Sequence, residues 1–139
     1  YDGIKEILPR IIPFFLQNLQ HPEVLVRNSA CWGISRYSTW ITQQDHKVYL
    51  EPMLVHLLNN MRHRSKSVQR ASCLAVTRLQ EKTRINLSPY FEPMVTAIVE
   101  ALKIYQSINL YTLYDCIGIF ATATVKYCTD EQKNQFASL

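Results

Sequence analysis

The sequence predicts an all-α fold built from repeated pairs of helices, and three observations support this prediction. Hydrophobic residues recur three and four positions apart over long stretches, which is the pattern of amphipathic helices. The chain has only 3 Gly, against 11% aromatic residues, which disfavours an all-β sandwich. The sequence also repeats itself, because residues 49–53 and 90–94 match closely at a spacing of 41. A period near 40 that contains two helices is typical of HEAT and armadillo solenoids, whose stacked units share one core.

A second internal match lies in the other half of each unit. Residues 26–36 and 68–78 share a Val, a Cys and an Arg at a spacing of 42. The predicted fold is therefore an α-solenoid of HEAT repeats, with about three antiparallel helix pairs and the start of a fourth. Its predicted units are HEAT repeats at residues 1–43, 44–84 and 85–128, followed by a truncated repeat at 129–139. Such units cannot bury their apolar faces alone, so we expect neighbours on both sides in a longer protein.

The first helix of each unit is predicted at residues 4–20, 47–63 and 88–105, because an apolar stripe runs along each segment. In the first segment the stripe consists of Ile4, Ile7, Leu8, Ile11, Ile12, Phe15 and Leu19. The other two segments carry equivalent stripes, Leu50, Met53, Leu54, Leu57, Leu58 and Met61, then Phe91, Met94, Val95, Ile98, Val99 and Leu102. Ser88 followed by Pro89 predicts a helix start, since the first turn needs no N–H from proline.

The second helix of each unit is predicted at residues 23–42, 66–82 and 108–127. Equivalent positions form a core stripe on each helix, namely Ala30, Ile34 and Tyr37, then Ser72, Val76 and Leu79, then Leu113, Ile117 and Phe120. The cysteines at 31, 73 and 116 are almost equally spaced, and no CxxC pair or zinc-type spacing occurs. We therefore expect these three side chains to be buried core thiols in a reducing compartment.

Trp32 lies on the opposite side of its predicted helix from the core stripe. At about 100° per residue, it points about 200° away from the core positions two residues before and after it. Leu74 and Asp115 occupy the equivalent positions in the next two units, and Glu81 lies within about 20° of Leu74. Stacked units align equivalent positions into one continuous, concave surface. An aromatic ring followed by two carboxylates suits an extended peptide that carries an apolar or aromatic group and a basic group.

Two other interpretations of this surface stay open. Trp32 could pack against a neighbouring unit, with the acids as ordinary solvated charges. Arg36 and Arg78 lie about 40° around their helices from the row of Trp32, Leu74 and Asp115. They could pair with the acids, which would weaken a site for basic peptides.

The rest of the sequence argues against catalysis. No catalytic, nucleotide-binding or metal-binding motif occurs, so we expect no enzyme activity and no cofactor or metal. The net charge of +4 is too small to indicate nucleic acid as a partner, and no apolar run reaches membrane-spanning length.

The basic stretch at residues 62–70 is interpreted as a solvated turn, with a patch for phosphate or an acidic partner as the alternative. The tyrosines within residues 105–114 are interpreted as aromatic packing between units.

Three segments carry a more specific resemblance. Residues 30–40, residues 67–73 and residues 103–118 each resemble the corresponding segments of transportins, nuclear import receptors of the importin-β family. The resemblance covers essentially the whole chain in register. It implies a central part of a long HEAT-repeat receptor that recognises extended nuclear localisation signals ending in a basic residue, a short spacer and Pro-Tyr.

The resemblance also implies roles for individual residues. The tryptophan that matches Trp32 packs on the Pro-Tyr end of the signal, and the acids that match Glu81 and Asp115 hold its upstream arginine. Ser29 stands where the family has an isoleucine beside the Pro-Tyr pocket, so the apolar contact is smaller here. Arg70 stands where the family tends to have an acid. Leu74 and Arg36 are expected to contribute more weakly to binding.

The implied partners are cargo proteins with nuclear localisation signals. Ran-GTP, which releases cargo in the family, and nucleoporins are implied as partners through parts of the parent protein mostly outside this chain. The implied location is the cytoplasm and the nucleus, with shuttling between them. The alternatives are a HEAT-repeat scaffold for a multiprotein complex, or another importin-β-family receptor that reads a signal without Pro-Tyr.

Overall fold

The computed structural model describes residues 2–82 and 88–127, and every regular element within these ranges is a helix. The elements are α1 (Asp2–Lys5), α2 (Leu8–Asn18), α3 (Val24–Arg36), α4 (Ser38–Thr42), α5 (Leu50–Met61), α6 (Lys66–Lys82), η1 (Ser88–Tyr90), α7 (Phe91–Ile104) and α8 (Ser107–Tyr127). The predicted all-α solenoid is thus confirmed.

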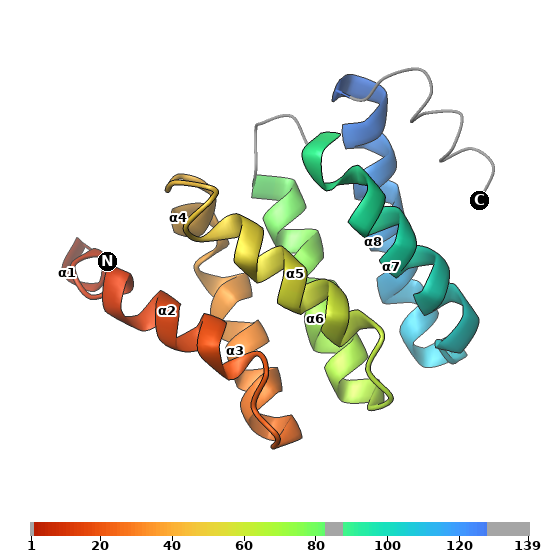
Figure 1. Ribbon diagram of the computed structural model, residues 1–139, viewed down its shortest axis with the longest axis horizontal. Coiled ribbons are helices and arrows are strands. Elements are labelled where there is room, and N and C mark those ends of the chain that lie inside the picture. Colours follow the sequence, from red (N-terminus) through yellow and green to blue (C-terminus); the bar gives the residue numbers. More distant parts are fainter. Residues whose placement is uncertain (1, 83–87, 128–139) are drawn as a thin grey trace.

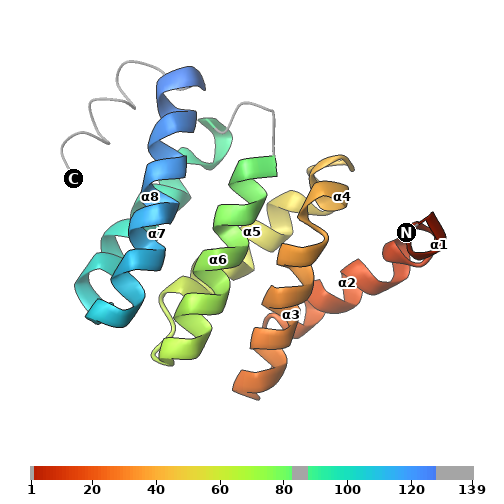
Figure 2. The ribbon, with the colours of Figure 1, turned by 180° about the vertical axis from the view of Figure 1, so that it is seen from behind.

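The helices form two layers (Figure 1). α2, α5 and α7 lie in one layer, and α3, α6 and α8 lie side by side in the other, as Figure 2 shows from behind. The contacts of α6 with α3 and α8 are more extensive than those of α5 with α2 and α7. Helices of the second layer therefore approach one another more closely, so the stack curves toward that layer and its outer face is the concave one.

The space between the layers is filled by apolar side chains, as the predicted stripes require. The largest fully buried ones are Phe91, Phe120, Ile12, Leu19, Ile34, Ile41, Leu50, Met53, Leu57, Met61, Leu79 and Met94. The rings of Phe91 and Phe120 pack together with centroids 5.6 Å apart, which joins α7 to α8. Burial of this apolar surface is the main source of stability for helices of this length.

The predicted helix boundaries agree best in the last two units. α6 and α8 begin and end within one residue of the predicted limits. The division into repeats at 1–43, 44–84 and 85–128 stays an interpretation of these helices. The predicted start of a fourth repeat at 129–139 lies outside the described residues, as does Cys128.

Two predicted helices are interrupted. The segment predicted at 4–20 is divided into α1 and α2, because Pro9 has no N–H to continue the ladder and sits in the first turn of α2. As a result Ile7 is 44% exposed rather than part of the core stripe. The segment predicted at 23–42 breaks at Tyr37, whose φ of −105° and ψ of 22° separate α3 from α4. Ser35 Oγ donates to the carbonyl of Cys31 beside this break, a bond that favours bending.

Buried amides tie each unit to the preceding one. Asn60 is 2% exposed, and its Nδ2 donates to the carbonyl of Leu19 at 3.0 Å while its Oδ1 accepts from Arg27 Nη1 at 2.8 Å. Asn109, also 2% exposed, donates to the carbonyl of Lys66 and to Gln69 Oε1. Both amides bind at the turn between the helices of the previous unit, and the Leu19 carbonyl is one that lacks a helical partner because it follows the end of α2.

The three equally spaced cysteines are buried free thiols, as predicted. Burial raises the pKa of Cys31 to about 12, although Arg27 acts in the opposite direction. The hydrogen bond with Cys116, together with burial, raises the pKa of Cys73. Cys31 and Cys73 are therefore neutral core residues at physiological pH, and their reactivity toward thiol reagents is low. The same hydrogen bond with Cys73 lowers the pKa of Cys116, against the effect of its burial.

Candidate functional site

The outer face of α3, α6 and α8 carries the predicted site residues. Trp32 is 56% exposed on α3, on the side predicted from its helical position. Glu81 on α6 and Asp115 on α8 are also exposed, and Leu74 between them is half-buried. The described units cover less than half of the surface of Trp32, and its binding role stays a prediction.

Ser29 and Arg36 lie on the same exposed side of α3 as Trp32. One turn of helix separates each of them from the tryptophan, so the three side chains form a short row along α3. The short side chain of Ser29 contributes little apolar surface to that row.

An open hollow of about 620 Å³ lies beside Trp32. We call it the Trp32 hollow, and its lining residues are Phe15, Trp32, Gly33, Ser35, Arg36, Tyr37 and Arg78. A Cβ at Gly33 would lie 2.5 Å from the ring of Phe15, so a larger residue at this position would force that ring to shift. The absence of a side chain lets the Phe15 ring lie against α3 and form the floor of the hollow.

The charges around the Trp32 hollow are partly paired. Arg78 Nη1 lies 3.2 Å from Glu81 Oε2, one helical turn away on α6. The guanidinium carbon of Arg36 lies 6.0 Å from the centroid of the Tyr37 ring. The pairing of an arginine with Glu81, which the sequence left as an alternative, is therefore present. Both partners are exposed, so solvent screens the pair and a charged ligand can replace either partner at small cost.

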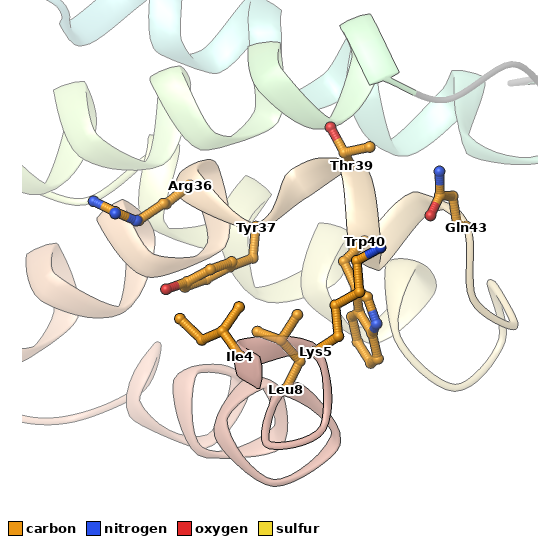
Figure 3. Close-up of a pocket in the computed structure, with 8 residues that line it drawn as sticks. All are labelled: Ile4, Lys5, Leu8, Arg36, Tyr37, Thr39, Trp40 and Gln43. Atoms are coloured by element: carbon orange, nitrogen blue, oxygen red, sulfur yellow. The ribbon is translucent and has the colours of Figure 1, made fainter. Parts of the chain in front are cut away.

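A smaller pocket of about 280 Å³ adjoins the Trp32 hollow and shares Arg36 and Tyr37 with it. Figure 3 shows its other lining residues, Ile4, Lys5, Leu8, Thr39, Trp40 and Gln43. The pocket lies where the chain bends between α3 and α4, so the helical pattern could not reveal it. Trp40 also packs edge-on against Tyr49, with ring centroids 5.3 Å apart, in agreement with a core role.

The tyrosines near the start of α8 differ from their prediction. Tyr105 is buried, and its hydroxyl donates to the carbonyl of Gln69. Tyr111 and Tyr114 are 78% and 55% exposed instead of packing between units. Both fall on the side of α8 away from the buried Leu113, which the tyrosine spacing alone did not reveal.

The basic stretch at residues 62–70 is partly paired rather than simply solvated. Arg62 Nη1 lies 3.2 Å from Glu100 Oε2 on α7. His63 Nδ1 accepts the N–H of Ser65, and burial followed by Arg27 and Arg64 lowers the pKa of this histidine. These contacts shape the turn between α5 and α6.

No group of three metal-binding side chains occurs in the described ranges. The described helices also include none whose length and hydropathy would fit the span of a bilayer.

Comparison with known proteins places these features in context. A family model for the HEAT-like repeat matches residues 2–37. Transportin of Dictyostelium discoideum is 40% identical over 120 residues, which is 86% of this chain and 13% of that protein. Transportin-1 of Homo sapiens is 38% identical over 120 residues, again 86% of this chain and 13% of that protein. Importin subunit beta-2 of Schizosaccharomyces pombe is 36% identical over 124 residues, which is 86% of this chain and 14% of that protein. The chain thus spans about an eighth of the length of these relatives.

Proposed function

We propose, because this chain is homologous to one segment of the transportins and importin beta-2 subunits, that it forms part of a nuclear import receptor. In this role it binds extended nuclear localisation signals that carry a basic residue, a short spacer and Pro-Tyr. The signal lies across the concave face of α3, α6 and α8.

The exposed ring of Trp32 is the observation that carries this proposal. A tryptophan that leaves 56% of its surface in water loses much of its possible hydrophobic stabilisation, which a bound ligand would restore. The adjoining hollow, with its floor at Phe15, offers an apolar surface for a proline and an aromatic ring. Aromatic side chains of this kind are typical anchors for peptide recognition.

The acidic residues supply the second part of the recognition. Asp115 and Glu81 lie on neighbouring helices and attract an arginine or lysine of the signal. A signal arginine that reaches Glu81 displaces Arg78 from its exposed ion pair. Because such exchange replaces one solvated pair by another, its net gain is small and the aromatic anchor contributes most of the affinity.

The wider mechanism follows that of the family. A disordered signal loses conformational entropy on binding, so its affinity depends on few anchors and the complex stays reversible. Ran-GTP then releases the cargo in the nucleus, and nucleoporins admit the receptor, through parts of the parent protein outside this chain. The receptor shuttles between cytoplasm and nucleus.

The experiment is fluorescence anisotropy of a labelled basic-Pro-Tyr peptide titrated with the chain. A control peptide has Ala-Ala in place of Pro-Tyr. Binding that weakens at least tenfold in the control would support the proposed signal class.

The other outcomes point to the alternatives. Equal binding of both peptides would contradict the Pro-Tyr specificity and favour an importin-β-family receptor for another signal. Absence of binding to either peptide would contradict the proposal and favour a scaffold that binds folded partners.

A further inference from the structure

The Trp32 hollow contains one side chain from the opposite layer, Phe15 of α2. The other residues that line the hollow belong to α3, to the bend after it or to α6. The sequence pattern placed Phe15 in the core stripe, and its side chain does pack against the buried core while it remains half-buried. Phe15 therefore belongs both to the core and to the surface of the hollow.

The ring of Phe15 occupies the space of the side chain that Gly33 lacks. A Cβ on Gly33 would lie 2.5 Å from Cε2 and Cζ of this ring and 2.8 Å from Cε1. These three atoms form the outer half of the ring, so the end of the ring lies directly beside the backbone of α3. Nonbonded carbons are ordinarily about 3.5–4.0 Å apart, so a Cβ at residue 33 would push the ring away by about 1 Å or more.

The backbone conformation gives no reason for a glycine at this position. No glycine in the described ranges has a positive φ, and Gly33 lies within α3. Glycine inside a helix is less stable than alanine, because it loses more conformational freedom on folding. The close approach of Phe15 is the structural feature that accounts for Gly33, and it determines where the floor of the hollow lies.

We propose that Phe15 contacts the aromatic ring of the bound signal, and that Gly33 is the positioning residue that holds Phe15 in place for this contact. The pair selects a planar ring over an aliphatic side chain in the Trp32 hollow. This inference rests on the proposed function, because the selected ring is that of the Pro-Tyr end of the signal. It goes beyond that function by assigning the selectivity to a residue of the other layer.

The selectivity follows from the different positions of two aromatic side chains. Trp32 is 56% exposed, whereas Phe15 is half-buried and lines the hollow from the layer behind α3. Trp32 offers apolar area to any ligand side chain. A ligand ring that also reaches Phe15 gains the edge-to-face or offset contact of two aromatic rings, which adds to the burial of area. An aliphatic side chain gains the burial alone, so Phe15 discriminates between the two.

The first test compares two neutral ligands, N-acetyl-tyrosinamide and N-acetyl-leucinamide. Neither contains a basic residue or a proline, so the comparison does not depend on the proposed signal class. NMR titrations that follow the indole N–H of Trp32 give both affinities. We expect a preference for the tyrosine ligand, which Phe15→Leu should reduce about two- to tenfold, the range for loss of an aromatic pair. Phe14→Leu, at the adjacent ring that is 61% exposed, should leave the preference unchanged.

A second comparison tests the role of Gly33. Gly33→Ala should lower the tyrosine preference, because the displaced Phe15 ring no longer forms the same floor. In a Phe15→Leu background the same change should have little effect on the preference, since the shorter leucine leaves room for the Cβ. Such non-additivity is expected of residues in contact. Gly118→Ala is the matched control, because a Cβ on this helical glycine meets no atom within 4 Å, and the preference should not change.

The contact is also measured without any substitution. In the unaltered chain, the ring protons of N-acetyl-tyrosinamide should show NOEs to the ring protons of Phe15. Absence of these NOEs, equal affinity for the two ligands, a tyrosine preference that survives Phe15→Leu, or a Gly33→Ala effect that persists beside Phe15→Leu would each overturn the inference.

The same measurements separate this inference from the proposed function. Failure of the basic-Pro-Tyr peptide to bind, beside a tyrosine preference that depends on Phe15, would reject the proposed function and leave the ring contact standing. Peptide binding that requires Pro-Tyr but is unaffected by Phe15→Leu would support the proposed function and reject this inference.

Discussion

At the residue scale, Trp32 combines a large apolar surface with an exposed position on a rigid helix. The neighbouring residues Cys31 and Ile34 are fully buried, so the backbone under the tryptophan is fixed by the core. Tryptophan offers a large contact area at a low cost in conformational entropy, which is why such residues act as anchors.

Replacement of this anchor tests the site directly. Trp32→Ala should weaken binding of the basic-Pro-Tyr peptide by about 1–3 kcal/mol, because contact area with the ligand is lost. The free energy of unfolding should change by less than about 0.5 kcal/mol, as for other surface substitutions. Anisotropy measures the first quantity and urea titration followed by circular dichroism the second.

Phe14 provides a matched control for Trp32. It is an aromatic residue with 61% exposure on α2, in the opposite layer. Phe14→Ala should leave peptide binding unchanged. A loss of stability in Trp32→Ala without loss of binding would mean that Trp32 is a core residue and that the proposed anchor is wrong.

Asp115 is expected to act by charge. Asp115→Lys should reduce affinity most for arginine-rich signals, since an attraction becomes a repulsion, and the reduction should shrink as salt increases. Glu6→Lys, an equal charge change at an exposed turn between α1 and α2, serves as the control. An equal loss of affinity for a signal without basic residues would contradict this role of Asp115.

The sequence predicted the orientation of single residues well where the helix was regular. Trp32 and Asp115 lie on the exposed side because each follows the period of an uninterrupted helix. The pairing of Arg78 with Glu81 was left open because helical position fixes neighbours but not rotamers. Tyr111 and Tyr114 were misjudged because clustering in sequence was taken for packing. The binding roles of all these residues stay predictions.

At the element scale, the helices follow their apolar stripes but end where local chemistry intervenes. Periodicity counts residues and does not detect a missing N–H, so the break caused by Pro9 was not predicted. The bend at Tyr37, where φ is −105° and ψ is 22°, is a local backbone feature that a hydrophobic pattern does not contain. The bend also creates the pocket of Figure 3, so a functional candidate arises where the regular pattern fails.

The buried amide of Asn60 links elements that the apolar core alone does not fix. Asn60→Leu keeps a similar volume but leaves the Leu19 carbonyl without its side-chain donor and Arg27 Nη1 without the Asn60 acceptor. We expect the free energy of unfolding to fall by about 1–3 kcal/mol, the cost of an unsatisfied buried polar group. Urea titration measures the difference.

Asn59 is the matched control, because it is the adjacent asparagine and is exposed. Asn59→Leu should cost no more than about 0.5 kcal/mol. If both substitutions cost the same, the amide of Asn60 does not hold the units together.

At the scale of the whole molecule, stability should fall in alkaline solution. The pKa of Cys31 is about 12 in the folded protein, against 9.0 for a free thiol, so the folded state retains a proton that the unfolded state releases. Stability is therefore fully present below pH 9 and is lost as the pH rises toward 12, with a slope of up to about 1.4 kcal/mol per pH unit. Burial, with smaller effects of Cys73 and Cys116, also raises the pKa of Tyr105, which adds to the loss above pH 10.

Urea unfolding at several values between pH 8 and pH 11 measures this dependence. Cys31→Ala should give a shallower slope than the unaltered chain, because one of the groups is removed. Stability that stays constant or increases over this range would show that these side chains are not buried as described.

The spacing of the helices has a consequence for the length of the peptide in the proposed function. Adjacent helices of a layer lie about 8–10 Å apart, and an extended peptide advances about 3.3 Å per residue. One step from α3 to α6 therefore matches about three peptide residues, and the two steps from Trp32 to Asp115 match about five or six. If the proposed signal lies across this face, the spacing of the helices would select signals by the number of residues between their aromatic and basic groups. Each added or removed repeat would then change the preferred separation by about three residues.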